Sequence, residues 1–226
     1  MQNLNNLSEA KTSFSRPGTM IDQPFRAWLA TRVQPLVRLY QHLGLSPNAI
    51  TLAGLAFGIF AAIATAMAAN TLAIALWWLG RLLDGTDGIY ARSSGRVTDF
   101  GGYLDILADM AGYSAMIIGF ACARPEQTCW WLTILALYVL CITSALSLGS
   151  LGTVGGNKGD NRSLRLAAGL AEGGETGLVY TALLVFPSAT QSLCTFWVFI
   201  LSMTVGARTL VAWRVLGEKG QGSASG

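Results

Sequence analysis

Six long apolar stretches dominate the chain. They lie at about residues 50–69, 72–92, 98–121, 128–150, 165–187 and 190–216, and short segments with polar residues, glycine or proline separate them. About 20 predominantly apolar residues in a row form a helix that crosses the hydrocarbon of a bilayer. The pattern therefore predicts an all-α integral membrane protein with six transmembrane helices.

The segment before the first apolar stretch has a different pattern. Residues 1–20 are polar and rich in Asn and Ser, which predicts disorder. In residues 21–44, apolar side chains recur at three- and four-residue steps, and Arg26, Arg32 and Arg38 fall between them. This spacing predicts an N-terminal amphipathic helix that lies in the membrane interface. The alternative is a cytosolic helix that packs on the protein's own loops.

These boundaries divide the chain into the N-terminal segment 1–20, the juxtamembrane helix 21–44, a membrane domain at 45–217 and a flexible tail at 218–226. Composition agrees, because 52% of the 226 residues are hydrophobic and only 12% are charged, whereas soluble proteins carry about 25% charged residues. The net charge of +3 is small and gives no indication of a nucleic-acid partner.

Lysine and arginine are concentrated on one side of the predicted topology. They lie before the first stretch, in the loops after the second and fourth stretches, and at the C-terminal end, while the opposite loops contain only Arg124. The cytoplasmic loops of membrane proteins carry an excess of Lys and Arg. We therefore expect both termini in the cytoplasm, in a bacterial-type inner (cytoplasmic) membrane.

Four aspartates interrupt the apolar pattern. Asp84 and Asp87 are three residues apart near the end of the second stretch, and Asp105 and Asp109 are four apart in the third. Each pair therefore shares one face of a helix. A carboxylate within a membrane span costs at least about 2.5 kcal/mol. A bound divalent metal is the simplest compensation, because carboxylate oxygens suit Mg²⁺, Mn²⁺ or Ca²⁺.

The residues between these aspartates complete a longer motif. From Asp84 to Asp109 the chain reads D-x2-D-G-x2-A-R-x8-G-x3-D-x3-D. At each fixed position this motif resembles the signature of the CDP-alcohol phosphatidyltransferase family. The six-span pattern and residues 46–51, at the start of the first span, are also similar to that family. The resemblance covers residues 45–215 and is weakest after residue 150.

The resemblance implies an enzyme that cleaves the pyrophosphate of a CDP-linked substrate, with attack by a hydroxyl and release of CMP. It implies that Asp84, Asp87, Asp105 and Asp109 bind Mg²⁺ or Mn²⁺, two ions per site, and that Asp109 is also the general base. It implies a homodimer as well. The residues that it places on the CDP moiety are Pro47, Asn48, Thr51, Gly88, Ala91, Arg92 and Thr98.

Charged residues in the second half of the chain are candidates for binding the acceptor alcohol. Arg165 and Arg208 either form a pocket for an anionic acceptor or are ordinary residues of the positively charged side. Glu172 and Glu175 lie at helical spacing in the fifth stretch and either bind acceptor hydroxyls or an amine, or pair with arginines. Their presence departs from the purely basic pocket expected for an inositol phosphate.

The sequence therefore predicts transfer of a phosphatidyl group from CDP-diacylglycerol to glycerol 3-phosphate, another polyol phosphate or phosphatidylglycerol, in phospholipid biosynthesis. One alternative is a CDP-choline or CDP-ethanolamine phosphotransferase that acts on diacylglycerol. The other is an ion or proton transporter, because acids within a membrane often line such pathways. The complete motif favours an enzyme, and no internal repeat of the transporter kind is visible.

Overall fold

The computed structural model describes residues 33–154 and 173–222, and within these ranges the regular structure is helical. The chain divides into two units, Met1–Gly44 and Leu45–Gly226. In the first unit, helix α2 (Gln34–His42) places Leu36, Val37 and Tyr40 on one face. The earlier part of the amphipathic helix predicted at residues 21–44, and the N-terminal segment 1–20, lie outside the described residues.

Long helices form the described part of the second unit, and each overlaps a predicted apolar stretch. They are α3 (Pro47–Ala66), α4 (Asn70–Ser93), α5 (Asp99–Ala123), α6 (Thr128–Val154), α8 (Gly173–Val185) and α9 (Thr190–Gly222). Short 3₁₀ turns at Pro125–Gln127 and Pro187–Ala189 precede α6 and α9. The last turns of α9 extend into the predicted tail.

Four segments of the described chain are long and apolar enough to cross a bilayer. They are Pro47–Ala66, Asp99–Ala123, Pro125–Ser150 and Pro187–Arg214. Helix α4 contains two arginines and two aspartates, which lower its apolar character. The described part of α8 has 13 residues and is therefore shorter than a full crossing. The protein is therefore a multi-pass membrane protein, and the crossings by α4 and α8 stay predictions.

Helices α3 and α5, whose N-terminal ends lie beside the C-terminal end of α4, each start with a polar capping residue. The Ser46 hydroxyl accepts the amide N–H of Ala49 at 3.2 Å at the start of α3. The Thr98 hydroxyl accepts the amide N–H of Gly101 at 3.0 Å at the start of α5. Such caps satisfy amide groups that the first helical turn leaves unpaired. The turn from α4 to α5 includes Gly95, whose φ of +66° favours glycine.

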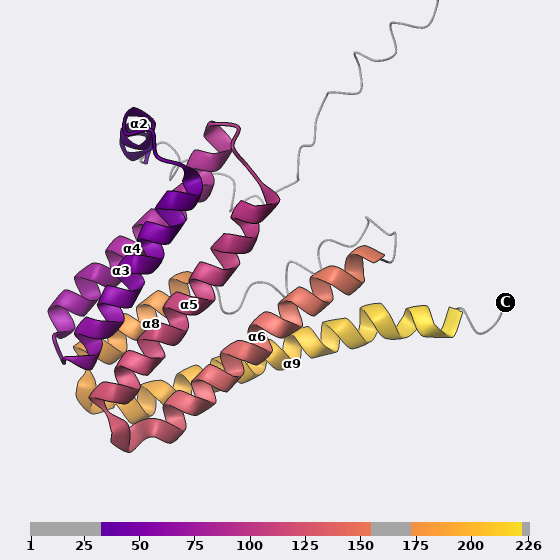
Figure 1. Cartoon of the computed structure of the whole chain (residues 1–226). Coiled ribbons are helices and arrows are strands. Elements are labelled where there is room, and N and C mark those ends of the chain that lie inside the picture. Colours follow the sequence, from indigo (N-terminus) through magenta and orange to yellow (C-terminus); the bar gives the residue numbers. More distant parts are fainter. Residues whose placement is uncertain (1–32, 155–172, 223–226) are drawn as a thin grey trace, which may run out of the picture. The chain divides into compact units, whose positions relative to one another are not determined.

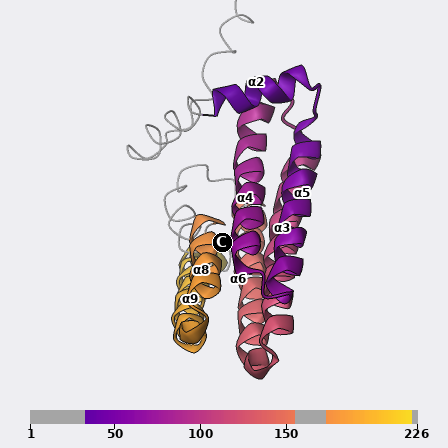
Figure 2. The same cartoon turned by 90° about the vertical axis from the view of Figure 1, so that its left-hand side faces the viewer.

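Glycines bring three of the helices into close contact. Helix α3 packs along α4 and α5, and the three run side by side in Figures 1 and 2. A Cβ atom on Gly80 of α4 would lie 2.8 Å from the carbonyl oxygen of Gly54 in α3. Two turns farther along α3, a Cβ atom on Gly119 of α5 would collide with the carbonyl oxygen of Ala62. The missing side chains therefore set the spacing of α3, α4 and α5.

Aromatic side chains with polar tips connect the remaining helices to α5. Helix α6 packs along α9 (Figure 1). The hydroxyl of Tyr180 in α8 lies 3.0 Å from the Tyr138 hydroxyl in α6 and 3.0 Å from the Tyr113 carbonyl oxygen in α5. The indole N–H of Trp197 in α9 donates to the Tyr138 hydroxyl at 3.0 Å. Buried polar groups that satisfy one another in this way fix the register of the four helices.

The substitution Gly119→Ala tests the close approach of α5 to α3. The added methyl group collides with backbone that cannot rotate away, so we expect a loss of about 1–3 kcal/mol in the free energy of unfolding. Thermal unfolding of the purified protein in detergent measures this loss. The control is Gly112→Ala on the same helix, where a Cβ atom meets nothing within 4 Å. Equal unfolding temperatures for the two variants would contradict the packing argument.

Candidate functional site

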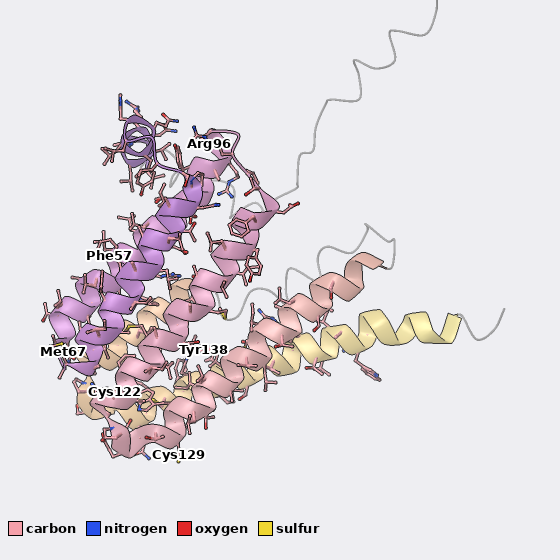
Figure 3. All side chains as sticks on the ribbon, viewed as in Figure 1. Phe57, Met67, Arg96, Cys122, Cys129 and Tyr138 are labelled. Atoms are coloured by element: carbon pink, nitrogen blue, oxygen red, sulfur yellow. The ribbon has the colours of Figure 1, made fainter. Side chains whose placement is uncertain are left out.

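A cavity of about 190 Å³ lies where the first turns of α3 and α5 meet the last turns of α4. Arg96, labelled in Figure 3, marks this end of the helices. The cavity is lined by all seven residues for which a contact with the CDP moiety is predicted, namely Pro47, Asn48, Thr51, Gly88, Ala91, Arg92 and Thr98, and also by Asp87, Gly101 and Asp105. Residues separated by up to 58 positions in the sequence therefore share one cavity.

The shape and charge of this cavity suit a phosphorylated ligand. The N-terminal ends of α3 and α5 border it, and helix N-termini attract anions through their free N–H groups and the helix dipole. The Arg92 side chain lies over Gly88, because a Cβ atom there would be 3.4 Å from its Nη1 atom. A Cβ atom on Gly101 would be 3.3 Å from Asn48 Oδ1. Glycine at both positions keeps the cavity open.

Three of the four aspartates converge beside the cavity. Asp84 and Asp87 from α4 and Asp105 from α5 each offer a carboxylate oxygen, and these oxygens lie within 4.8 Å of one another. Asp87 is buried, with 5% of its surface exposed. The hydroxyl of Thr51 in α3 donates a short hydrogen bond to Asp87 Oδ2, which fixes the orientation of that carboxylate. Three hard oxygen donors at this separation fit a divalent cation such as Mg²⁺ or Mn²⁺.

The fourth aspartate, Asp109, has a different partner. Arg81 Nη1 donates to Asp109 Oδ1 at 2.6 Å and lies 3.4 Å from Asp84 Oδ2. Asp109 is therefore held by a guanidinium and does not belong to the group of three. Arg81 is not among the site residues predicted from the sequence. Its spacing could have identified it, because Arg81 lies three residues before Asp84 and both side chains therefore share one face of α4.

A second cavity, of about 100 Å³, lies farther along α5. Its lining includes Met110 and Tyr113 of α5, Tyr138 and Cys141 of α6, Thr176 of α8 and Arg208 of α9; Tyr138 is labelled on α6 in Figure 3. Arg208 is only 7% exposed and donates to the Cys141 carbonyl oxygen at 2.7 Å. The cavity thus combines apolar walls with tyrosine hydroxyls and one buried cation.

The other predicted acceptor residues do not line this second cavity in the described chain. Glu175 is an exposed residue in the first turn of α8. Arg165 and Glu172 lie outside the described residues. Arg208 therefore lines the second cavity together with Tyr113, whose hydroxyl accepts a hydrogen bond from Arg81 at 3.1 Å.

Some known proteins are similar to this chain in sequence, and others are similar in fold. The family model for CDP-alcohol phosphatidyltransferase matches residues 44–156. The inner membrane protein YnjF of Escherichia coli is 34% identical over 172 residues, covering 71% of this chain and 81% of YnjF. The archaetidylinositol phosphate synthase of Pyrococcus horikoshii is 30% identical over 149 residues, covering 63% of this chain and 72% of that enzyme.

Solved structures with the same fold come from the phosphatidylinositol phosphate synthase of Mycobacterium tuberculosis. Its structure with CDP-DAG bound has a TM-score of 0.61 at 20% identity, covering 79% of this chain and 92% of that one. Its complex with manganese and citrate has a TM-score of 0.62 at 19% identity, covering 80% and 88%. With the match of the family model, the chain belongs to the CDP-alcohol phosphatidyltransferase family and is a phosphotransferase enzyme.

Proposed function

We propose that the protein transfers a phosphatidyl group from CDP-diacylglycerol to the hydroxyl of a phosphorylated polyol and releases CMP. The observation that carries this proposal is the cavity at the α3, α4 and α5 ends, because it combines helix N-termini, Arg92 and two of the aspartates. Pyrophosphate binding needs positive charge and amide donors, and this cavity supplies both.

Asp84, Asp87 and Asp105 hold the divalent metal in this proposal. When bound, Mg²⁺ or Mn²⁺ neutralises the charge of the pyrophosphate and so makes its phosphorus easier to attack. The protein's own part is to orient the donor: Arg92 pairs with a phosphate, and Thr51 holds Asp87 in place. Pro47, Asn48, Gly88, Ala91 and Thr98 complete the nucleotide site. The manganese complex of the mycobacterial synthase supports the same class of metal.

Asp109 is the proposed general base. It lies one helical turn beyond Asp105 on α5, and 28% of its side chain is exposed, so a substrate hydroxyl can reach it. Its bond to Arg81 uses Oδ1, which holds the carboxylate in one orientation. From this position Asp109 takes the proton of the acceptor hydroxyl as that oxygen attacks the phosphorus.

The second cavity is the proposed acceptor site. Arg208 supplies a buried positive charge there, and Tyr113 connects the cavity to Arg81 and Asp109. A buried guanidinium suits the phosphate of a polyol phosphate. The names of the relatives support this class of acceptor, since one is an archaetidylinositol phosphate synthase and another a phosphatidylinositol phosphate synthase. Arg165, Glu172 and Glu175 stay proposed acceptor contacts.

Two further features of the protein stay proposals as well. The distribution of Lys and Arg supports cytoplasmic termini, which would open the nucleotide cavity toward the cytoplasm. The family resemblance supports a homodimer.

The variant Asp109→Asn tests the assignment of the base. It keeps the shape of the side chain but removes its ability to accept a proton, so we expect the rate of CMP release to fall at least about 100-fold. Binding of CDP-diacylglycerol should stay close to that of the wild type. The assay uses labelled CDP-diacylglycerol, Mn²⁺ and a panel of acceptor alcohols.

Asp99→Asn is the matched control, because Asp99 lies in the first turn of the same helix and lines neither cavity. A wild-type rate for Asp109→Asn would show that the base is a different group. No CMP release by the wild type with any acceptor and either metal would count against the proposed reaction as a whole.

The variant Arg208→Gln tests the acceptor site. Loss of a charged hydrogen bond of about 1.5–3 kcal/mol should raise the KM for a phosphorylated acceptor roughly 10- to 100-fold, while CDP-diacylglycerol binding stays unchanged. Steady-state CMP release with glycerol 3-phosphate, an inositol phosphate, phosphatidylglycerol and neutral alcohols measures this. Arg214→Gln, an exposed position on the same helix, is the control. If the protein preferred a neutral acceptor, and if the KM for that acceptor were the same in the wild type and in Arg208→Gln, the proposal of an anionic pocket would be refuted.

A further inference from the structure

Arg81 connects carboxylates of two helices. From α4, its Nη1 atom donates to Asp109 Oδ1 of α5 at 2.6 Å and lies 3.4 Å from Asp84 Oδ2 of its own helix. Only 13% of the Arg81 side chain is exposed. Where water is largely excluded, the attraction between a guanidinium and a carboxylate is larger than at the surface, and leaving one partner unpaired is costly.

Aromatic rings hold this guanidinium in place. The Cζ atom of Arg81 lies 5.2 Å from the ring centroid of Trp77 and 5.2 Å from that of Tyr113. Trp77 is 1% exposed and Tyr113 is 5% exposed, so both rings are themselves fixed by packing. The Tyr113 hydroxyl also accepts a hydrogen bond from Arg81 Nη1 at 3.1 Å. The cation is thus built into the core and is costly to move.

The position of Arg81 divides the four aspartates into two sets. The carboxylate oxygens of Asp84, Asp87 and Asp105 lie within 4.8 Å of one another, whereas Oδ1 of Asp109 accepts a hydrogen bond from Arg81. A divalent ion that also uses Asp109 would have to lie close to the guanidinium. Because two cations at such a distance repel each other, they compete for the same carboxylate.

We propose that Arg81 is a resident cation that competes with metal for Asp109, so that the site is loaded in two unequal steps. The first ion binds Asp84, Asp87 and Asp105 tightly. The second ion binds much more weakly, because it must displace Arg81 from Asp109. This inference rests on the proposed metal dependence and adds an order of loading to it.

The test is a titration of the purified full chain with Mn²⁺ in detergent, without nucleotide, in which electron paramagnetic resonance measures the free ion. In the wild type we expect one tight ion and a second whose Kd is at least about tenfold higher, or no detectable second ion. In Arg81→Gln we expect the second Kd to fall at least about tenfold, so that the ratio of the two constants narrows.

Two further variants separate competition from a general change of charge. Arg92→Gln removes one positive charge from the cavity that Asp87 and Asp105 also line, and it should leave the ratio of the two constants unchanged. Tyr113→Phe keeps the ring and removes one hydrogen bond to Arg81, so it should narrow the ratio by a smaller factor. It also gives a result if Arg81→Gln does not fold.

Each outcome decides between the inference and the function on which it rests. Two ions of equal affinity in the wild type would overturn the inference alone. The inference would also be overturned if the ratio of the two Kd values were as large in Arg81→Gln and in Tyr113→Phe as in the wild type. A wild type that binds no Mn²⁺ at all would overturn the proposed metal dependence, and this inference with it.

Discussion

The arrangement of the site depends on the compensation of four carboxylates on two neighbouring helices of a membrane protein. Carboxylates in surroundings of low polarity are tolerated only with positive charge close by. The structure meets this need in two ways. Arg81 binds Asp109 at 2.6 Å, and the remaining three carboxylates gather where a divalent cation fits. The Thr51 hydroxyl orients Asp87, and the rings of Trp77 and Tyr113 hold the Arg81 guanidinium in place.

Close helix packing is what allows the carboxylates to meet. The contact between Gly54 and Gly80 brings α3 against α4 one turn before Asp84. This approach places Thr51 of α3 within hydrogen-bonding distance of Asp87. A larger residue at Gly80 would push α3 away and leave the buried Asp87 oxygen without its donor, which is costly in a buried site. Gly54 and Gly80 therefore influence the site by setting the distance between α3 and α4, and they do so without contacting a ligand.

The local part of this architecture could be predicted from the sequence, because it depends on spacing along single helices. The motif from Asp84 to Asp109 predicted the family, and the seven residues for which nucleotide contacts are predicted share one cavity. The partnership of Arg81 with Asp109 could not be predicted in this way. It joins residues 28 positions apart, and it depends on the rotation of α4 against α5 and on the two rings that hold the guanidinium. The cavity at Arg208 likewise combines four helices, which no local pattern reveals.

Helix α5 places the parts of the proposed reaction in a fixed order. Gly101, Gly102 and Asp105 border the nucleotide cavity, Asp109 follows one turn later, and Met110 and Tyr113 border the second cavity. At about 1.5 Å of rise per residue, Gly101 and Tyr113 are roughly 18 Å apart along the helix axis. In the proposed reaction, donor and acceptor therefore approach from opposite sides of Asp109, and the proposed base lies between them. Because Asp109 and Tyr113 lie about one turn apart on the same helix, an acceptor held in the second cavity lies close to the proposed base. In the proposed reaction, the same helix geometry thus links recognition of the acceptor to removal of its proton.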